Sequence, residues 1–145
     1  MPSPHEAFWT NTTFAVVGRS ASKPFPALTY NALKAMEDKT VYAVDPSRDE
    51  VEGDPAFNDL STLPTPVDAV VLEVPAEETA SWVERAADAG ITKIWIHMGR
   101  ETPEALTLAD ERGLELCTGT CAVQYLRGGF PHNLHRLLRR AAGRW

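Results

Sequence analysis

Cysteine is scarce in this sequence: Cys117 and Cys121 are the only two among 145 residues. Two cysteines are too few for a disulfide framework, and their spacing does not give the CxxC pair typical of a structural zinc site. Long apolar runs are also missing, since none approaches the roughly 20 residues that a membrane span needs. Residues 1–13 lack the basic start and apolar stretch of a secretory signal. We therefore expect a cytoplasmic, water-soluble protein whose cysteines are buried, reduced thiols.

Standard phosphate-binding and catalytic motifs are absent as well. The loop from Gly18 to Pro24 holds a single glycine, so it matches neither GxGxxG nor GxxxxGK[ST]. This excludes the usual dinucleotide fingerprint and the nucleoside triphosphate loop. There is no GxSxG nucleophile elbow, and spacing singles out no Ser, His and Asp set. We therefore find no catalytic set and expect a binding protein rather than an enzyme.

Positive charge is sparse over most of the chain. The net charge of -6 disfavours nucleic acid as a partner, because phosphate backbones need a basic face. The C-terminal segment is the exception, since it combines five arginines and no acid with apolar residues at helical spacing. The arginines are Arg127, Arg136, Arg139, Arg140 and Arg144, and the apolar residues are Leu134, Leu137, Leu138 and Ala141. This pattern predicts a basic helix over residues 131–143, which either docks to a partner, pairs in a homodimer or packs on the sheet.

What the chain does have is a regular alternation of apolar strands and amphipathic helices. Continuously apolar segments predict five strands, at 14–17, 41–44, 69–74, 93–98 and 114–117, covered on both faces as in a parallel sheet. Between them, helical patterns are centred on Leu28 to Met36, on Trp82 to Ala87 with Gly90 as the end signal, and after the capping Thr102. Residues 46–66 are expected to be mostly loop, with one short helix around Ser61–Leu63. This order predicts one doubly wound, Rossmann-like α/β domain with a mainly parallel, five-stranded sheet, over residues 14–145 after an N-terminal extension of 1–13.

Such a fold places ligands beyond the carboxyl ends of its strands. After the first strand, backbone amides at a helix start, two hydroxyls and two bases suit a phosphate or pyrophosphate, whereas an ordinary tight turn is the alternative. The residues concerned are Gly18, Arg19, Ser20, Ser22 and Lys23.

The end of the second strand offers Asp45, Pro46 and Arg48. An acid at this point holds a ribose hydroxyl in nicotinamide-binding sheets, so Asp45 keeps a nicotinamide cofactor open as an alternative. Arg48 suits an additional phosphate on the ribose. The same Asp-Pro-Ser sequence is also common in simple turns.

The third and fourth strands end in "LEVP" and "IHMG". Pro75 fixes the backbone and removes a donor, so Val74 and Pro75 can offer a flat apolar wall to a ring. Gly99 allows a close approach of the backbone beside Met98. His97 is either a core histidine or a ligand contact.

The ordered set "VVGRSASKP", "VDPSR", "LEVP", "IWIHMG" and "TGTCAVQYL" resembles the small CoA-binding proteins with the fold of the succinyl-CoA synthetase alpha subunit. The resemblance runs from Phe14 to about Leu138 and implies coenzyme A or an acyl-CoA as the small-molecule nucleotide ligand. It places Gly18, Arg19, Ser20, Ser22 and Lys23 around the phosphates, Asp45, Pro46 and Arg48 around the ribose, and Val74, Pro75, Met98 and Gly99 beside the ligand. Cys121 occupies a cysteine position of the family.

Two departures from the family pattern bear on this expectation. Asp45 stands where relatives usually have asparagine, and its charge would repel a 3'-phosphate unless Arg48 or Lys23 compensates. The C-terminal tail also differs from the shorter ends of many relatives, and its His132 and His135 favour a surface role over metal binding.

Three alternatives remain open at this stage. One is an NAD(P)-binding regulatory or redox-sensing domain, supported by Asp45. Another is an interaction module that docks through the C-terminal helix. A third possibility adds to CoA binding a mixed disulfide between Cys121 and the CoA thiol under oxidising conditions.

Overall fold

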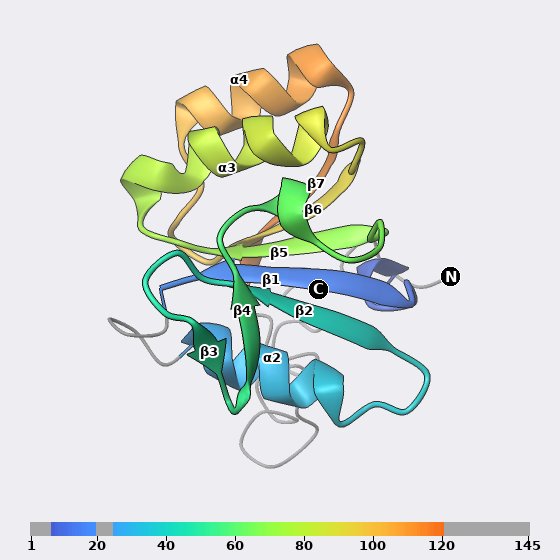
Figure 1. Cartoon of the computed structure of the whole chain (residues 1–145). Helices are drawn as coiled ribbons and strands as arrows, with labels where there is room; N and C mark the ends of the chain where they lie inside the picture. Colours follow the sequence, from blue (N-terminus) through green and yellow to red (C-terminus); the bar gives the residue numbers. More distant parts are fainter. Residues whose placement is uncertain (1–6, 20–24, 121–145) are drawn as a thin grey trace.

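The computed structural model describes residues 7–19 and 25–120, which form a seven-stranded sheet with helices on both faces (Figure 1). In chain order the elements are β1 (Thr13–Gly18), α2 (Phe25–Lys34), β2 (Thr40–Val44), β3 (Glu50–Val51), β4 (Asp54–Phe57), the 3-10 helix η1 (Leu60–Thr62), β5 (Ala69–Glu73), α3 (Ala76–Asp88), β6 (Lys93–His97), α4 (Pro103–Arg112) and β7 (Glu115–Thr120).

The sheet winds outward in two directions from its centre. Its strand order is β3-β4-β2-β1-β5-β6-β7, and all neighbours are parallel except the β3–β4 pair. From β1 the chain first builds one side through β2 and β4, and then crosses to β5 on the other side. The switch of direction between β1 and β5 confirms the doubly wound, Rossmann-like prediction, and ligands of such sheets bind at this point.

The strand count of five was wrong, because residues 46–66 contain two further strands. β3 and β4 form a hairpin through Glu52 and Gly53, which both have positive φ, at 52° and 82°. Such a turn fits the twist of a hairpin. The two strands were missed because β3 has only two residues and β4 carries a proline, which is typical of edge strands. The 3-10 helix η1 confirms the one short helix expected here.

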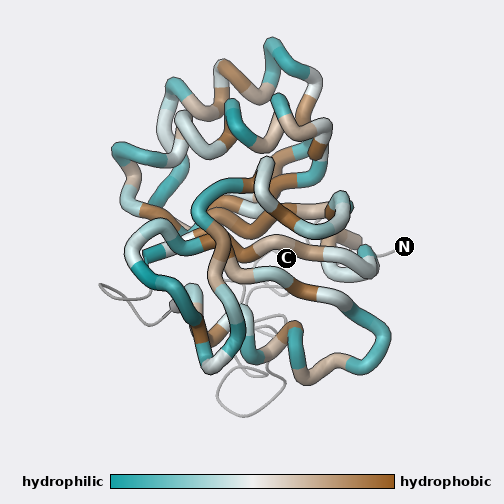
Figure 2. Tube along the Cα trace, viewed as in Figure 1, coloured by the Kyte–Doolittle hydropathy of each residue, from teal (hydrophilic) through white to brown (hydrophobic). Residues whose placement is uncertain are grey.

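Each face of the sheet has its own core. On one face α3 and α4 cover side chains such as Val17, Leu72 and Ile96, and on the other Leu33 of α2 packs in a cluster with Val16 and Val71. Figure 2 shows the apolar residues concentrated in the strands between the helical layers. Within the described ranges, no helix has the length and apolar character that crossing a membrane requires.

The helix ends follow the signals in the sequence. Thr102 caps α4 by accepting a hydrogen bond from the backbone N–H of Ala105 (3.2 Å), and Gly113 ends that helix with a φ of 67°. After α3, Gly90 has a φ of 80° and donates from its backbone N–H to the carbonyl of Ala87 (3.0 Å). Both helix boundaries are therefore as expected.

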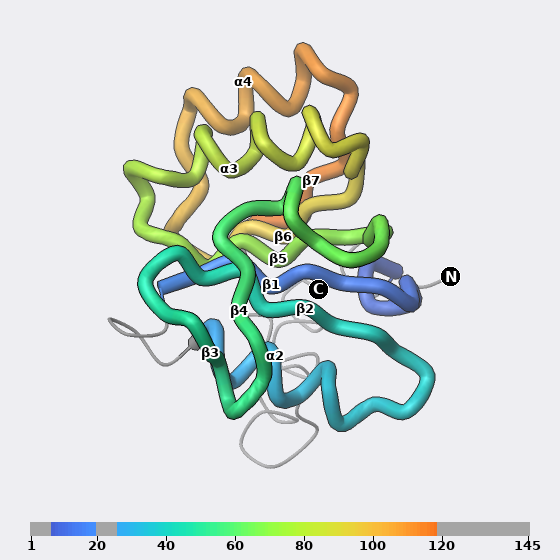
Figure 3. The backbone as a smooth tube through the Cα atoms, in the orientation of Figure 1, coloured from blue at the N-terminus to red at the C-terminus, as the bar shows by residue number. Residues whose placement is uncertain are grey.

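Helix α2 differs from the predicted pattern in the face that it buries. Its buried side chains include Thr29, Tyr30 and Leu33, whereas Ala35, within the segment 28–36 of the predicted helical pattern, is exposed and follows the end of the helix. The polar groups are buried because each has a partner. For example, the Tyr30 hydroxyl donates to Asp54 of β4 (2.6 Å), and this hydrogen bond ties the β3–β4 hairpin to α2. Figure 3 shows the backbone of this hairpin beside that of α2.

The described end of the N-terminal extension packs against the sheet. Phe8 is 5% exposed, and its ring centroid lies 5.8 Å from that of Phe14 and 5.4 Å from that of Trp95. Cys117 closes the same core cluster, and burial raises the pKa of its thiol to about 11. The expected buried, reduced thiol is thus confirmed for Cys117.

Candidate functional site

The carboxyl ends of four parallel strands meet at one edge of the sheet. Register places Gly18 of β1 opposite Glu73 of β5, and Val17 opposite Val44 of β2. The residues that follow these strand ends are therefore neighbours. We call this region the carboxyl edge, which comprises residues 18–19, 45–48, 74–75 and 98–99.

Gly18 lets helix α2 approach the end of β1 closely. A Cβ atom at Gly18 would lie 2.2 Å from Cγ and 2.6 Å from Cβ of Pro26, in the first turn of α2. Real Cβ atoms do not come so near another carbon, so any side chain here would push the helix away. Close contact of a strand end with a helix start is the geometry of anion-binding sites in this fold class.

Arg19 follows Gly18 and is paired with an acid from α3. Its Nε lies 2.6 Å from Oε2 of Glu78, and its Nη2 lies 2.9 Å from Oε1 of the same carboxylate. These hydrogen bonds hold the pKa of Glu78 below its usual value. Both side chains remain partly exposed, at 38% and 26%. A guanidinium that donates two hydrogen bonds to one carboxylate can also donate two hydrogen bonds to a phosphate.

A pocket of about 450 Å³ opens beside this ion pair. We call it the edge pocket, and it is lined by Arg19, Pro46, Asn58, Glu78, Ser81, Trp82 and Arg85. It brings together two residues predicted for the site, Arg19 and Pro46. Its other lining residues come from the end of β4 and from α3.

The turn after β2 is held by the side chain of Asp45. Its Oδ1 accepts hydrogen bonds from the backbone N–H of Ser47 (2.9 Å) and from the Ser47 hydroxyl, and the residue is only 2% exposed. Asp45 therefore acts first as a turn residue. Pro46 and Arg48 are exposed on the outer side of this turn.

The ends of β5 and β6 provide the remaining predicted residues. Val74 is buried, and the half-buried Pro75 precedes the first turn of α3. Met98 is 44% exposed and is one of the two large exposed apolar side chains of the described residues. Gly99 has a φ of 80°, which requires glycine, in the turn where the N–H of Arg100 donates to the carbonyl of His97 (2.9 Å).

Four of the predicted site residues, Ser20, Ser22, Lys23 and Cys121, lie outside the described residues, as does the predicted C-terminal helix. Among those described, Gly18, Arg19, Asp45, Pro46, Arg48, Val74, Pro75, Met98 and Gly99 all lie at the carboxyl edge, although only Arg19 and Pro46 line the edge pocket.

A buried polar cluster lies just inside the same edge. Thr29 Oγ1 donates to Oε2 of Glu73 (3.0 Å), and Nδ1 of His97 lies 3.4 Å from that oxygen. Burial raises the pKa of Glu73, and its contacts with His97 and Thr29 partly offset this rise. The sequence left open whether His97 is a core residue, and the structure places it in the core with an acidic partner.

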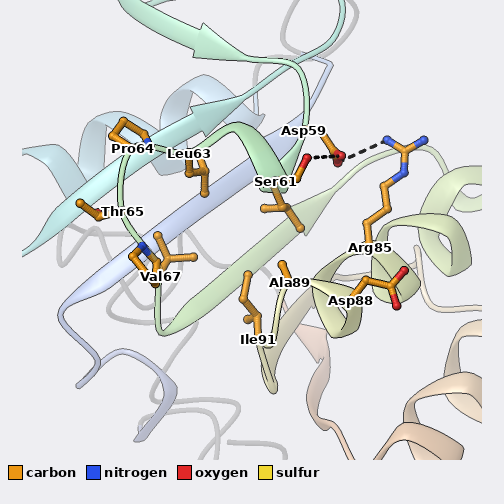
Figure 4. Close-up of a pocket in the computed structure, with 12 residues that line it drawn as sticks. Asp59, Ser61, Leu63, Pro64, Thr65, Val67, Arg85, Asp88, Ala89 and Ile91 are labelled. Carbon is orange, nitrogen blue, oxygen red and sulfur yellow. Dashed lines mark hydrogen bonds and ion pairs between the residues drawn. The ribbon is translucent and has the colours of Figure 1, made fainter.

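A second pocket, of about 380 Å³, lies near the amino ends of β5 and β6 (Figure 4). It is lined mainly by apolar residues such as Leu63, Val67 and Ile91, with the Asp59–Arg85 ion pair (3.7 Å) at one side. No residue predicted for the site lines it. We call it the amino pocket.

Sequence reasoning missed Asn58, Glu78 and Arg85 of the edge pocket. As an acid in the first turn of a helix, Glu78 has a sufficient local explanation in the sequence, and nothing there indicates its contact with Arg19. Asn58 was missed because β4 was expected to be loop. Had residues 54–57 been recognised as a parallel strand, the next residue would have been placed at the carboxyl edge.

Residues 12–126 match the family model of the CoA binding domain, and the chain belongs to this family. The family assignment confirms the resemblance seen in the sequence. A search of curated proteins found no match.

Solved structures show the same fold. A hypothetical protein from Pyrococcus horikoshii OT3 is 25% identical with a TM-score of 0.72, and the match covers 85% of this chain and 89% of that one. A conserved hypothetical protein from Pyrococcus furiosus is 28% identical with a TM-score of 0.68, over 76% and 95% of the two chains. The dinucleotide forming acetyl-coenzyme A synthetase 1 of Ca. Korarchaeum cryptofilum is 23% identical with a TM-score of 0.62 over 82% of this chain, which matches 28% of the synthetase chain.

Proposed function

We propose that this protein binds coenzyme A or an acyl-CoA across the carboxyl edge of its sheet. The observation that carries the proposal is the Gly18–Arg19 corner. There a strand end approaches a helix start, and a guanidinium stands beside a pocket in a chain of the CoA binding domain family. CoA carries a pyrophosphate and a further phosphate, which such a corner is suited to bind.

The strand order supports one direction for the ligand. The turn after β2 would take the adenosine with its 3'-phosphate, at Asp45, Pro46 and Arg48. The β1 loop would take the pyrophosphate, with Gly18, Arg19, Ser20, Ser22 and Lys23. The pantetheine arm would then run towards the ends of β5 and β6, along Val74, Pro75, Met98 and Gly99. This direction follows from the order β2-β1-β5-β6 in the sheet.

The environment of Asp45 favours CoA over a nicotinamide cofactor. Its carboxylate is buried and accepts hydrogen bonds within its own turn, so it has a structural use that does not involve a ribose hydroxyl. Arg48 is exposed and would meet the 3'-phosphate, which NAD lacks. The same residue would also suit the phosphate of NADP, so the experiment must include both dinucleotides.

Titration calorimetry with CoA, acetyl-CoA, dephospho-CoA, NAD and NADP tests the proposal. We expect CoA and acetyl-CoA to bind with similar affinity, dephospho-CoA to bind more weakly, and neither dinucleotide to compete. Preference for NAD or NADP, or no binding of CoA, would overturn the proposal. Equal affinity for CoA and dephospho-CoA would remove the role given to Arg48, and Arg48→Ala should then change neither affinity.

A further inference from the structure

Three polar side chains from three elements meet in the interior just below the carboxyl edge. They are Thr29 of α2, Glu73 of β5 and His97 of β6. The side chain of Glu73 is 1% exposed, whereas that of His97 is 8% exposed. Both side chains are therefore buried, and His97 is the less enclosed of the two.

Burying this pair lowers the stability of the fold unless its polar atoms are fully hydrogen-bonded. Enclosing a carboxylate without full hydrogen bonding is strongly unfavourable, and apolar residues of similar volume are often more stabilising than a buried charged pair. Within the described residues, Oε1 of Glu73 is buried and has no hydrogen-bond partner. Glu73 and His97 are therefore buried side by side although apolar residues would fill the same space with less loss of stability.

The position of the pair relative to the proposed ligand is informative. Glu73 immediately precedes Val74 and Pro75, and His97 immediately precedes Met98 and Gly99. These are the positions towards which the pantetheine arm of CoA would run, and that arm ends in the thiol. The pair would therefore stand below the reactive end of the ligand, at the far side of the sheet centre from the adenosine.

From this arrangement we infer that His97 is a general base for the thiol of bound CoA, and that Glu73 is its positioning residue. The inference rests on the proposed function. In the step, the S–H bond of CoA breaks, its electron pair stays on sulfur as a thiolate, and the proton moves to the imidazole of His97. The imidazolium that forms lies 3.4 Å from the Glu73 carboxylate, which stabilises it, and Thr29 holds the carboxylate in place. A thiolate is the nucleophilic form of the cofactor, so the pair would prepare CoA for acyl transfer.

The surroundings of Glu73 act on its carboxyl group in two opposite ways. Burial raises the pKa of this group, whereas the contacts with His97 and Thr29 favour the carboxylate and lower it. Of the described side chains, Thr29 on α2 and His97 on β6 are those that contact it. The positioning role of Glu73 therefore depends on these two contacts.

The direct test is the pKa of the thiol in bound CoA. It is measured by NMR, from the chemical shift of the methylene carbon bonded to sulfur, as the pH is varied with protein in excess. Free CoA in the same buffer is the reference. We expect the bound thiol to titrate about one pH unit or more below the free thiol, which corresponds to at least about a tenfold larger thiolate fraction at neutral pH.

Three variants assign the effect to residues. His97→Asn removes the base, and Glu73→Gln keeps the shape of the side chain but not its charge. In both, we expect the thiol pKa to return to that of free CoA while the affinity for CoA changes less than threefold, or about 0.7 kcal/mol. Glu111→Gln is the matched control, because it removes an exposed glutamate in the last turn of α4, where the chain leads into the amino end of β7. It should leave the shifted thiol pKa as it is in the wild type.

The outcomes separate the two proposals. If CoA binds but its thiol titrates as in free solution, the inference is wrong and the proposed function stands. If the thiol pKa is lowered equally in the wild type and in both folded variants, the base lies elsewhere and the inference is again wrong. If CoA does not bind to the wild type, both proposals fail. Circular dichroism checks the fold of each variant, and if one variant does not fold, the other variant and the wild-type titration still decide.

Discussion

The two edges of the sheet differ in where they bury polar groups. In the described part of the chain, the buried polar or charged residues are Thr29, Asp45, Glu73, Thr79 and His97. All of them lie at the carboxyl ends of strands or in the helical turns that face those ends. At the amino ends, polar side chains such as Asp68 and Lys93 are exposed, and the amino pocket is lined mainly by apolar residues.

This difference indicates which edge was shaped by function. Burying polar groups opposes stability unless they are well paired, so a protein that needed only to fold would bury few of them. The amino edge follows that rule, with its charged residues in water. The carboxyl edge departs from it, and it is also where a doubly wound sheet binds its ligands.

The largest effect that we expect is a loss of stability on substitution of a residue of the amino pocket. Ile91→Ala removes a side chain that is 5% exposed in the core under α3, so we expect the free energy of unfolding to fall by about 3 kcal/mol. CoA affinity per folded molecule should not change, because Ile91 precedes the amino end of β6, whereas the proposed CoA site lies at the carboxyl ends of the strands. Urea denaturation measures the first effect and calorimetry the second. A parallel loss of affinity would mean that the two edges are not separate in function.

At the carboxyl edge we expect a substitution to change the affinity for CoA more than the stability. Arg19→Ala removes a charge that would contact the pyrophosphate, so the dissociation constant for CoA should rise about tenfold, or about 1.4 kcal/mol. Stability should change little, because the Arg19–Glu78 pair is partly exposed. Calorimetry and thermal unfolding of the same preparation measure both. An unchanged dissociation constant would show that the corner is only a structural turn.

The pH dependence of stability tests the raised pKa of the buried Glu73. Because the pKa of Glu73 is raised in the folded state, the wild type loses stability as the pH rises from about 4.3, the ordinary glutamate pKa, through the folded value. Glu73→Gln lacks this loss. The stability of the variant relative to the wild type should therefore increase with pH across that window, by at most about 1.4 kcal/mol per pH unit for one proton.

Urea denaturation at several pH values measures this difference, with Glu111→Gln as the control. The control should follow the wild type at every pH, because Glu111 is exposed. A difference between Glu73→Gln and the wild type that does not vary with pH would contradict the raised pKa of Glu73.

The smallest expected effect concerns Glu78. Its carboxylate oxygens lie 2.6 Å and 2.9 Å from nitrogens of the Arg19 guanidinium, and a phosphate of CoA would have to compete with them. Glu78→Gln weakens that competition, so CoA affinity should improve by a few-fold, up to about 1 kcal/mol. Competition calorimetry resolves such a change. A weaker affinity would instead mean that Glu78 orients Arg19 for the ligand.

The sequence predicted the central strands and helices α3 and α4, because apolar strands and capping residues act locally. The described residues predicted for the site consequently lie at one edge of the sheet. Thr102 and Gly90 mark helix ends without help from the rest of the chain. The β3–β4 hairpin was missed because β3 has only two residues and β4, which lies between β3 and β2, carries Pro55, so both strands give little local signal.

Local sequence patterns could not predict contacts between residues that are far apart in the chain. The Arg19–Glu78 pair joins the residue after β1 to α3, and the Thr29–Glu73–His97 cluster joins three elements. In the sequence, Glu78 fits a helix start and His97 fits an apolar strand, so each had a sufficient local explanation. Only the register of the strands and the packing of the helices bring these side chains together.

The central claim is that CoA lies on the carboxyl edge of the sheet, and amide NMR of the full chain titrated with CoA tests it most directly. The account predicts that the largest shifts fall on the backbone amides of Gly18, Arg19, Asp45 and Gly99. Amides near the amino pocket, such as those of Val67 and Ile91, should remain in place. Shifts confined to the amino pocket, or none at saturating CoA, would contradict the account.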